Sequence, residues 1–348
     1  MWSPNEFLGI ELPIVQAPMA GVQASELAIA VSTAGGLGAL PCAMLSLDQM
    51  RAELSQIRDR TRKPFNVNFF CHTPPEPDPT REAAWRVALS KYYEEFGIDA
   101  DAISPAPSRS PFSEQAADLL EEFKPPVVSF HFGLPSRGLM ARVKASGCTI
   151  LGCATNVDEA LWLEAHGVDA VIAQGFEAGG HQGTFLSSLS GDVATPVGTF
   201  ALLPQVVKAV KLPVIAAGGI ADAGGVAAAL SLGAAAVQIG TSYLLCREAT
   251  TSAVHRAALK NTDSRYTTIT RIFSGRPARG IVNRLIRELG PMNDLAPAFP
   301  LAAAALAPLR SKAESRGDGG FSPLWCGQNA TGCAELPASV VTHMLAGA

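Results

Sequence analysis

Residues 213–245 read PVIAAGGIADAGGVAAALSLGAAAVQIGTSYLL. An apolar run at 213–219 ends in two glycines, a helical stretch follows at 224–233, and a second apolar run covers 235–245. The first run is apolar throughout, which is typical of a parallel strand covered on both faces. The stretch therefore predicts a strand–helix–strand unit with parallel strands.

The same alternation runs through most of the chain. Further strands are expected at 12–18, 37–41, 65–70, 127–133, 149–155 and 170–175, and further helices at 25–36, 46–61, 113–123, 136–147, 157–167 and 201–211. Eight such units in one run predict an α/β fold of the TIM (β/α)8 barrel type. An open dinucleotide-binding sheet would show GxGxxG after the first strand, and QAPMAGV at 16–22 does not match it.

Two segments break the rhythm. A proline-rich insertion lies near 72–112, and a long loop at 184–199 follows the sixth strand. We predict a barrel over residues 1–260, and a mostly helical C-terminal appendage over 261–348 that covers the barrel mouth and shapes the pocket.

Composition narrows the class of protein. The chain has 348 residues, 48% hydrophobic and 17% charged, with a net charge of −4, which favours a large folded core over disorder. No basic stripe suggests a nucleic-acid partner, and no apolar run reaches the roughly 20 residues that span a membrane. The seven scattered cysteines show no metal-ligand spacing. With no signal peptide at the N-terminus, we expect a cytoplasmic protein.

The loops after the last two strands are the first candidate site. Gly218 and Gly219 end the seventh strand, and Gly240 and Thr241 end the eighth. In TIM barrels these two loops frequently bind phosphate through backbone N–H groups. The pattern favours a phosphorylated ligand, and tight turns that only close the loops are the alternative.

A second candidate is QGFEAGGHQG at 174–183, which follows the sixth strand. Its glycines let the backbone approach a ligand closely, and they leave His181 as the one imidazole facing the mouth. Gln174 offers an amide to the polar edge of a heterocycle. A flexible turn with a surface histidine is the alternative.

Other strands end at the same mouth. Pro18 and Met19 follow the first strand and Asn68 lies in the third, where each could also be merely structural. His131 is more typical of a buried supporting residue than of a catalyst, and His72, among prolines, could lie on the surface or at the mouth. No metal motif, nucleophile elbow or pair of catalytic carboxylates is present.

Taken in order, these motifs resemble those of the nitronate monooxygenases, formerly called 2-nitropropane dioxygenases. The resemblance rests on PIVQAPMAG, PFNVNFFCH, HFGLP, QGFEAGGHQG, PVIAAGGI and AVQIGTSYL, and FSGRPARG and LWCGQ extend it toward the C-terminus. It implies a TIM barrel that binds FMN and oxidises alkyl nitronates with molecular oxygen to a carbonyl compound and nitrite.

The resemblance also implies roles for particular residues. His181 matches the active-site histidine, which would hydrogen-bond the nitronate or act as a base toward a neutral nitroalkane. The implied FMN-binding residues are Met19, Asn68, Gln174, Gly179, Gly218, Gly219, Gln238, Ile239, Gly240 and Thr241. Flavin-dependent NAD(P)H reductases, acting on enoyl-ACP or quinones, carry a similar glycine–histidine loop and are the main alternative. For them, Arg271 or Arg276 could bind a pyrophosphate. A barrel that binds flavin or phosphate but has no catalytic activity is a further alternative.

Overall fold

A computed structural model describes residues 2–100, 103, 109–186 and 196–348. The predicted insertion near 72–112 and the predicted loop at 184–199 therefore lie partly outside the described residues. Eight parallel strands form the central sheet, in the order β1-β9-β8-β6-β5-β4-β3-β2. A parallel bridge between Val15 and Leu37 joins the two ends, so the sheet closes into the predicted TIM barrel.

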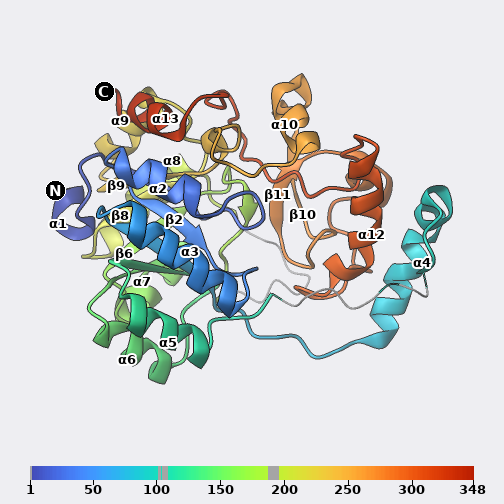
Figure 1. The fold of residues 1–348 in the computed structure, drawn as a ribbon, viewed down its shortest axis with the longest axis horizontal. Coiled ribbons are helices and arrows are strands. Elements are labelled where there is room, and N and C mark those ends of the chain that lie inside the picture. Colours follow the sequence, from blue (N-terminus) through green and yellow to red (C-terminus); the bar gives the residue numbers. More distant parts are fainter. Residues whose placement is uncertain (1, 101–102, 104–108, 187–195) are drawn as a thin grey trace.

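The strands and their outer helices follow the predicted order (Figure 1). The strands are β1 (Ile14–Gln16), β2 (Gly38–Pro41), β3 (Phe65–Phe70), β4 (Val127–His131), β5 (Thr149–Ala154), β6 (Ala170–Gln174), β8 (Val214–Ala217) and β9 (Ala236–Ile239). The helices are α2 (Ser25–Thr33), α3 (Leu47–Arg60), α5 (Glu114–Phe123), α6 (Arg137–Ala145), α7 (Val157–Ala165), α8 (Thr199–Ala209) and α9 (Ala223–Ser231).

Side chains along a strand alternate between two cores, because successive residues point to opposite faces. In β8, Val214 and Ala216 pack outward against the helices, whereas Ile215 and Ala217 pack inside the barrel. Both faces are thus apolar and buried, which explains the unbroken apolar run in the sequence. The last strand is shorter than predicted, because Gly240 is followed by a 3-10 turn, η2 (Thr241–Tyr243).

Two further helices complete the barrel. Helix α1 (Pro4–Leu8) precedes β1, and the last helix, α13 (Ala338–Ala346), packs against α2 and α9. Part of the C-terminal segment therefore lies on the barrel wall.

The remainder of that segment lies where the strands end. It contains α10 (Ala253–Lys260), η3 (Thr262–Arg265), β10 (Thr267–Thr270), β11 (Ala278–Ile281), α11 (Arg284–Leu289) and α12 (Ala302–Ser315). The two strands were not predicted, and they form an antiparallel sheet with β7 (Gly180–His181). The pairing of β11 with β7 joins residues about 100 positions apart in sequence, so no local periodicity could predict it.

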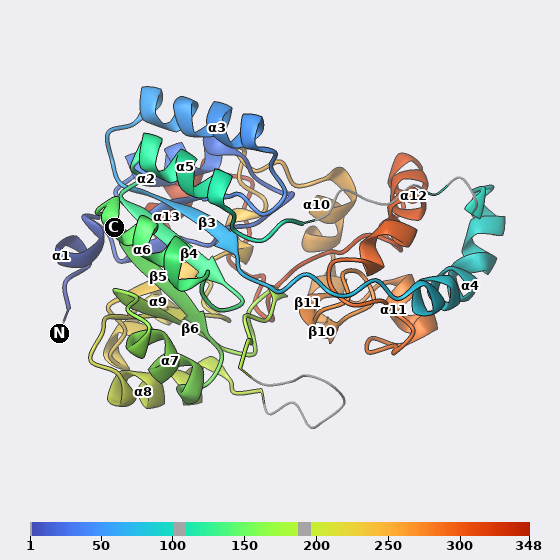
Figure 2. The ribbon, with the colours of Figure 1, turned by 90° about the horizontal axis from the view of Figure 1, so that it is seen from below.

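The insertion contributes helix α4 (Pro79–Phe96), which lies beside α12 in both ribbon views (Figures 1 and 2). Asp78 caps its start and Gly97, with a φ of +62°, ends it. Trp85, Leu89 and Tyr93 of α4 share a separate apolar cluster with residues of α12. The insertion and the C-terminal segment, far apart in sequence, therefore pack as one unit.

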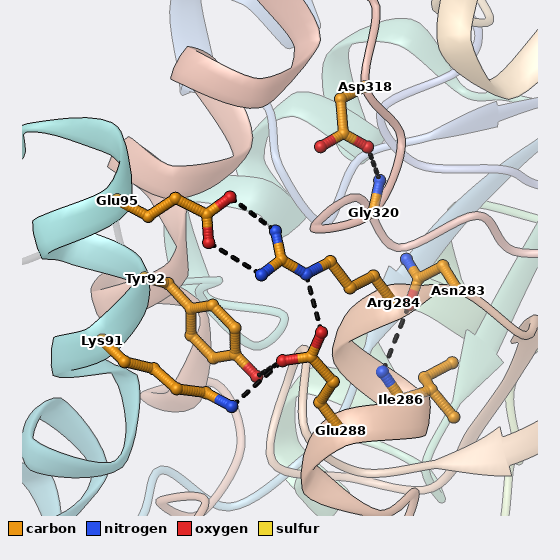
Figure 3. A network of polar contacts seen from close by, with 9 residues as sticks. All are labelled: Lys91, Tyr92, Glu95, Asn283, Arg284, Ile286, Glu288, Asp318 and Gly320. Atoms are coloured by element: carbon orange, nitrogen blue, oxygen red, sulfur yellow. Dashed lines mark hydrogen bonds and ion pairs between the residues drawn. The ribbon is translucent and has the colours of Figure 1, made fainter.

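A polar network on the edge of this cluster joins α4 to α11 (Figure 3). Arg284 forms paired contacts with Glu95 at 2.6 and 2.7 Å, and its Nε contacts Glu288 at 2.7 Å. Tyr92 donates to the same Glu288 at 2.9 Å. Hydrogen bonds from Arg284 lower the pKa of Glu288 to about 2. The network joins α4 to α11 of the C-terminal segment.

Candidate active site

A cavity opens at the carboxyl ends of the barrel strands. Its walls come from the loops after β1, β2, β3, β4, β6, β8 and β9, and from the C-terminal segment. Every residue that the sequence analysis assigned to the site lines it: Met19, Asn68, Gln174, Gly179, His181, Gly218, Gly219, Gln238, Ile239, Gly240 and Thr241. The structure thus brings the predicted set together in one cavity.

The two glycine turns offer free donors to this cavity. Within the described residues, no hydrogen bond takes up the backbone N–H groups of Gly219 and Gly240. Gly218 has a φ of +115° and Gly219 a φ of +75°, conformations that other residues rarely adopt. Converging unpaired N–H groups bind anions such as phosphate. These turns therefore fit the phosphate of FMN.

A free acceptor lies on the same wall. The Oε1 atom of Gln238 is buried and has no hydrogen-bond partner among the described residues. A buried amide oxygen without a partner is costly, so it indicates a ligand donor. The flavin ring carries such an N–H group, and Gln238 fits it.

Gln174 is less free than the sequence suggested. Its Oε1 accepts from Gly183 N at 2.7 Å, and its Nε2 donates to the carbonyl oxygen of His181 at 3.0 Å. Both ends of the amide thus hold the glycine–histidine loop in shape.

The remaining predicted residues are tied to the cavity wall. Met19 is held by a bond from its backbone N–H to Gln23 at 2.9 Å, and Asn68 donates to Ser129 Oγ at 2.9 Å. Thr241 Oγ1 accepts from Gly327 N at 2.9 Å. A Cβ atom at Gly179 would lie 2.5 Å from the same backbone nitrogen of Gly327, so only glycine fits there. Residues near Gly327, in the C-terminal segment, thus form this part of the cavity wall.

Glu177, in the middle of the same loop, was not singled out from the sequence. Its carboxylate accepts from Thr199 N at 2.8 Å, and Thr199 Oγ1 lies 3.0 Å from the carbonyl oxygen of Gly218. This chain of contacts joins the loop after β6 to the start of α8 and to the glycine turn at Gly218.

His181 lies on a strand and not in a flexible turn. Gly180 and His181 form β7, which pairs with Arg279 and Ala278 of β11. The carbonyl oxygen of His181 also lies 3.2 Å from the Nε2 atom of His131. His131 therefore supports the backbone of His181. The backbone of His181 is thus held on both sides, by β11 and by His131.

The ring of His181 has one defined polar partner. Its Nε2 atom lies 2.9 Å from Ser274 Oγ, and Ser274 Oγ lies 3.1 Å from the carbonyl oxygen of Arg276. A carbonyl only accepts, so the single hydroxyl proton of Ser274 goes to Arg276. Keeping both contacts requires the proton of a neutral His181 on Nε2, which leaves Nδ1 as the basic atom.

Aromatic rings surround this imidazole. The ring centroid of His181 lies 5.3 Å from that of Phe299, 5.5 Å from Trp325, 5.8 Å from Phe132 and 6.1 Å from Phe70. Burial, and then the positive charge of Arg109, lowers the pKa of His181 well below its ordinary value. His181 is therefore neutral near pH 7 and free to accept a proton.

His72, in contrast, is not among the cavity-lining residues. Its ring is buried 4.8 Å from that of Phe299, centroid to centroid, and neither ring nitrogen has a partner within the described chain. Burial lowers the pKa of His72 to about 4, so it adds no charge at neutral pH.

Sequence reasoning missed several residues at this site. Ser274, Phe299 and Trp325 contact His181, and Arg109 and Asn329 also line the cavity. Ser274 lies in the FSGRPARG motif and Trp325 in LWCGQ, so the motifs were noticed but not placed. Arg109 lies in the insertion and carried no signal.

Two negative findings belong to the described residues. No three His, Cys, Asp or Glu side chains in this part of the chain converge on a possible metal site. No helix in it is long and apolar enough to cross a membrane.

Comparisons with known proteins agree with the geometry. The family model described as nitronate monooxygenase matches residues 4–344. A nitronate monooxygenase from Pseudomonas aeruginosa is 43% identical over 348 residues, covering 98% of this chain and 97% of the relative. The crystal structure of nitroalkane oxidase from Streptomyces ansochromogenes superposes with a TM-score of 0.89 at 41% identity, covering 97% of this chain and 95% of that one.

The fold, the cavity and these matches define a flavin-dependent oxidoreductase built on a TIM barrel. The chain belongs to the nitronate monooxygenase family, whose members use FMN, and it oxidises nitronates.

The reductase alternative has weaker support. The enoyl reductase domain of MlnA from Bacillus amyloliquefaciens superposes with a TM-score of 0.54 at 16% identity, covering 88% of this chain and 69% of that one. Similarity at this level shows the shared fold alone.

Proposed function

We propose that the cavity binds FMN along its β8–β9 wall and a small alkyl nitronate beside His181, and that molecular oxygen completes the reaction to a carbonyl compound and nitrite. The unpaired donors at Gly219 and Gly240 support the phosphate end, and the unpaired Oε1 of Gln238 supports the ring end. FMN, when bound, accepts electrons from the nitronate and transfers them to oxygen.

His181 is the residue that we assign to substrate. Its lowered pKa and its aromatic surroundings support a neutral imidazole in a water-poor pocket. With Nε2 donating to Ser274, the Nδ1 lone pair can take the α-proton of a neutral nitroalkane. Ser274 would then act by holding the tautomer, a positioning role.

The single observation that carries this proposal is that His181, which Ser274 contacts, lines the same cavity as the glycine turns. Rapid mixing of the FMN-loaded protein with a nitronate under anaerobic conditions tests it through the loss of flavin absorbance.

We further propose that residues 261–348 shape the substrate pocket. Three contacts support this role, those of Ser274, Phe299 and Trp325 with His181. All seven cysteines are free thiols, in keeping with the cytoplasmic location that we expect.

A further inference from the structure

The cavity has an unusual charge distribution. Among the described residues that line it, Arg109 is the one permanently charged side chain, and no carboxylate is present. The other titratable groups on the wall are His131, His181 and His255, and burial lowers the pKa of each. One fixed positive charge therefore faces a pocket of otherwise neutral groups.

The position of Arg109 places this charge near the assigned substrate site. Its guanidinium carbon lies 5.6 Å from the ring centroid of Phe299, and that ring lies 5.3 Å from the ring of His181. The same guanidinium makes the largest charge contribution to the lowered pKa of His181. Arg109 and His181 thus both lie close to Phe299, and both line the cavity.

Among the described residues, Arg109 also has no acidic partner. No ion pair joins it to any acidic group in the described part of the chain. The neighbouring Arg276 differs, because it lies over Phe132 at 3.9 Å and donates to the carbonyl oxygen of Thr184. A mostly buried guanidinium without a counter-ion favours an anionic ligand.

A nitronate is such a ligand, since it carries its negative charge mainly on two oxygen atoms. Neutral His181 provides no charge for it, and its Nε2 proton is engaged by Ser274. A guanidinium presents paired N–H donors that match a two-oxygen anion.

We propose that Arg109 is the residue that selects the anionic nitronate over the neutral nitroalkane, by binding the oxygens of the nitro group. This inference rests on the function proposed above and adds to it a specificity determinant. His181 and Arg109 then have separate tasks: His181 handles the proton, and Arg109 holds the charge.

Arg109→Gln and Arg109→Lys test this proposal, with Arg62→Gln as the matched control because Arg62 is exposed on the far side of the barrel. Steady-state rates are measured with a nitronate and with its neutral nitroalkane, and FMN content and melting temperature are recorded for each variant. We expect Arg109→Gln to raise KM for the nitronate roughly 10- to 100-fold, as for a lost charged hydrogen bond. KM for the neutral form should change less than about threefold, and Arg109→Lys, which keeps the charge but not the paired donors, should recover only part of the loss.

A binding measurement adds a readout that does not depend on turnover. Nitrate is a planar anion of similar charge, and its binding beside the flavin is followed by the change in the flavin spectrum. We expect saturable nitrate binding in the wild type and in Arg62→Gln, and a loss of roughly tenfold or more in Arg109→Gln.

Three outcomes would overturn the proposal. An unchanged nitronate KM in Arg109→Gln is one, an equal rise for neutral and anionic substrates is another, and undiminished nitrate binding is the third. A wild type that oxidises no nitronate would instead overturn the proposed function, and nitrate binding would still decide whether Arg109 is an anion site.

Discussion

The Nε2 atom of His181 and the hydroxyl oxygen of Ser274 lie 2.9 Å apart, although 93 residues separate them in sequence. Because Ser274 also contacts the carbonyl oxygen of Arg276 at 3.1 Å, the pair selects one tautomer of His181. The side chain that we assign to substrate comes from the barrel, and the side chain that we propose orients it comes from the C-terminal segment.

Replacing Ser274 tests this relationship. Ser274→Ala should lower the rate of flavin reduction by neutral nitroalkanes roughly 3- to 10-fold, since one orienting hydrogen bond is worth about 1 kcal/mol. Ser274→Thr keeps the hydroxyl and should recover most of the rate. Stopped-flow absorbance measures the rate of flavin reduction in both variants. A wild-type rate in Ser274→Ala would contradict the proposal that Ser274 selects the tautomer of His181.

His181→Asn distinguishes a role of His181 as a general base from a role in binding the substrate. The variant should retain FMN and lose roughly 10²–10⁴-fold of its rate with a neutral nitroalkane, the usual contribution of a general base. With a nitronate, which is already deprotonated, the loss should be much smaller. Parallel anaerobic traces with the two forms give the comparison, and equal losses would contradict a role as base.

The phosphate turn is best tested at Gly240. Its φ of −112° is accessible to other residues, whereas Gly218 at +115° would be strained by any side chain. Gly240→Val directs added carbons toward Ala17 and Met19 and should weaken FMN binding by tenfold or more, about 1.4 kcal/mol. Gly138→Ala, where nothing lies within 4 Å of an added Cβ, is the control. Flavin fluorescence titration measures the FMN affinity of both variants. Equal affinities would show that the phosphate does not bind at the Gly240 turn.

Acid should destabilise the protein through its buried histidines. His255 contacts the carbonyl oxygen of Trp325 at 3.1 Å, and burial lowers its pKa to about 4. The unfolded chain, with a pKa near 6.5, binds the proton first, so stability is full above pH 6.5 and falls as the pH drops toward 4. His255 alone should account for roughly 2–3 kcal/mol of that loss by pH 4.5.

His255→Gln checks the sign of this effect, because it keeps a donor for Trp325 but does not titrate. Denaturant unfolding at pH 7 and pH 4.5 gives the free energy of unfolding for each protein. The difference between the two pH values should shrink in the variant. An unchanged difference would show that His255 takes no part.

The sequence was sufficient for the barrel and for the residues on its own loops. Unbroken apolar strands, serine caps and glycine turns are local signals, and they led to Gly218, Gly240 and His181 correctly placed around one cavity. The end of β9 was misjudged, because Tyr243 and Leu244 are apolar but belong to a 3-10 turn and its cap.

Long-range pairing was beyond the reach of these local signals. The pairing of β7 with β11, the packing of α4 on α12 and the arrival of Ser274 and Trp325 at His181 all join distant segments. Gln174 was noticed but its hydrogen bonds turn toward the loop, which depends on the backbone of residues 181–183. Arg109 lies in no recognised motif. That it is the one permanently charged side chain among the described cavity-lining residues can be seen only in three dimensions.

The most direct test of the account is anaerobic flavin reduction by a nitronate compared with NADH and NADPH. The FMN-loaded protein is mixed with each reductant in a stopped-flow spectrophotometer, oxygen is then admitted, and nitrite is assayed. We predict rapid loss of flavin absorbance with the nitronate, slow or no loss with either nicotinamide, and nitrite on reoxidation. Rapid reduction by NADH with none by the nitronate would contradict the account and favour a reductase.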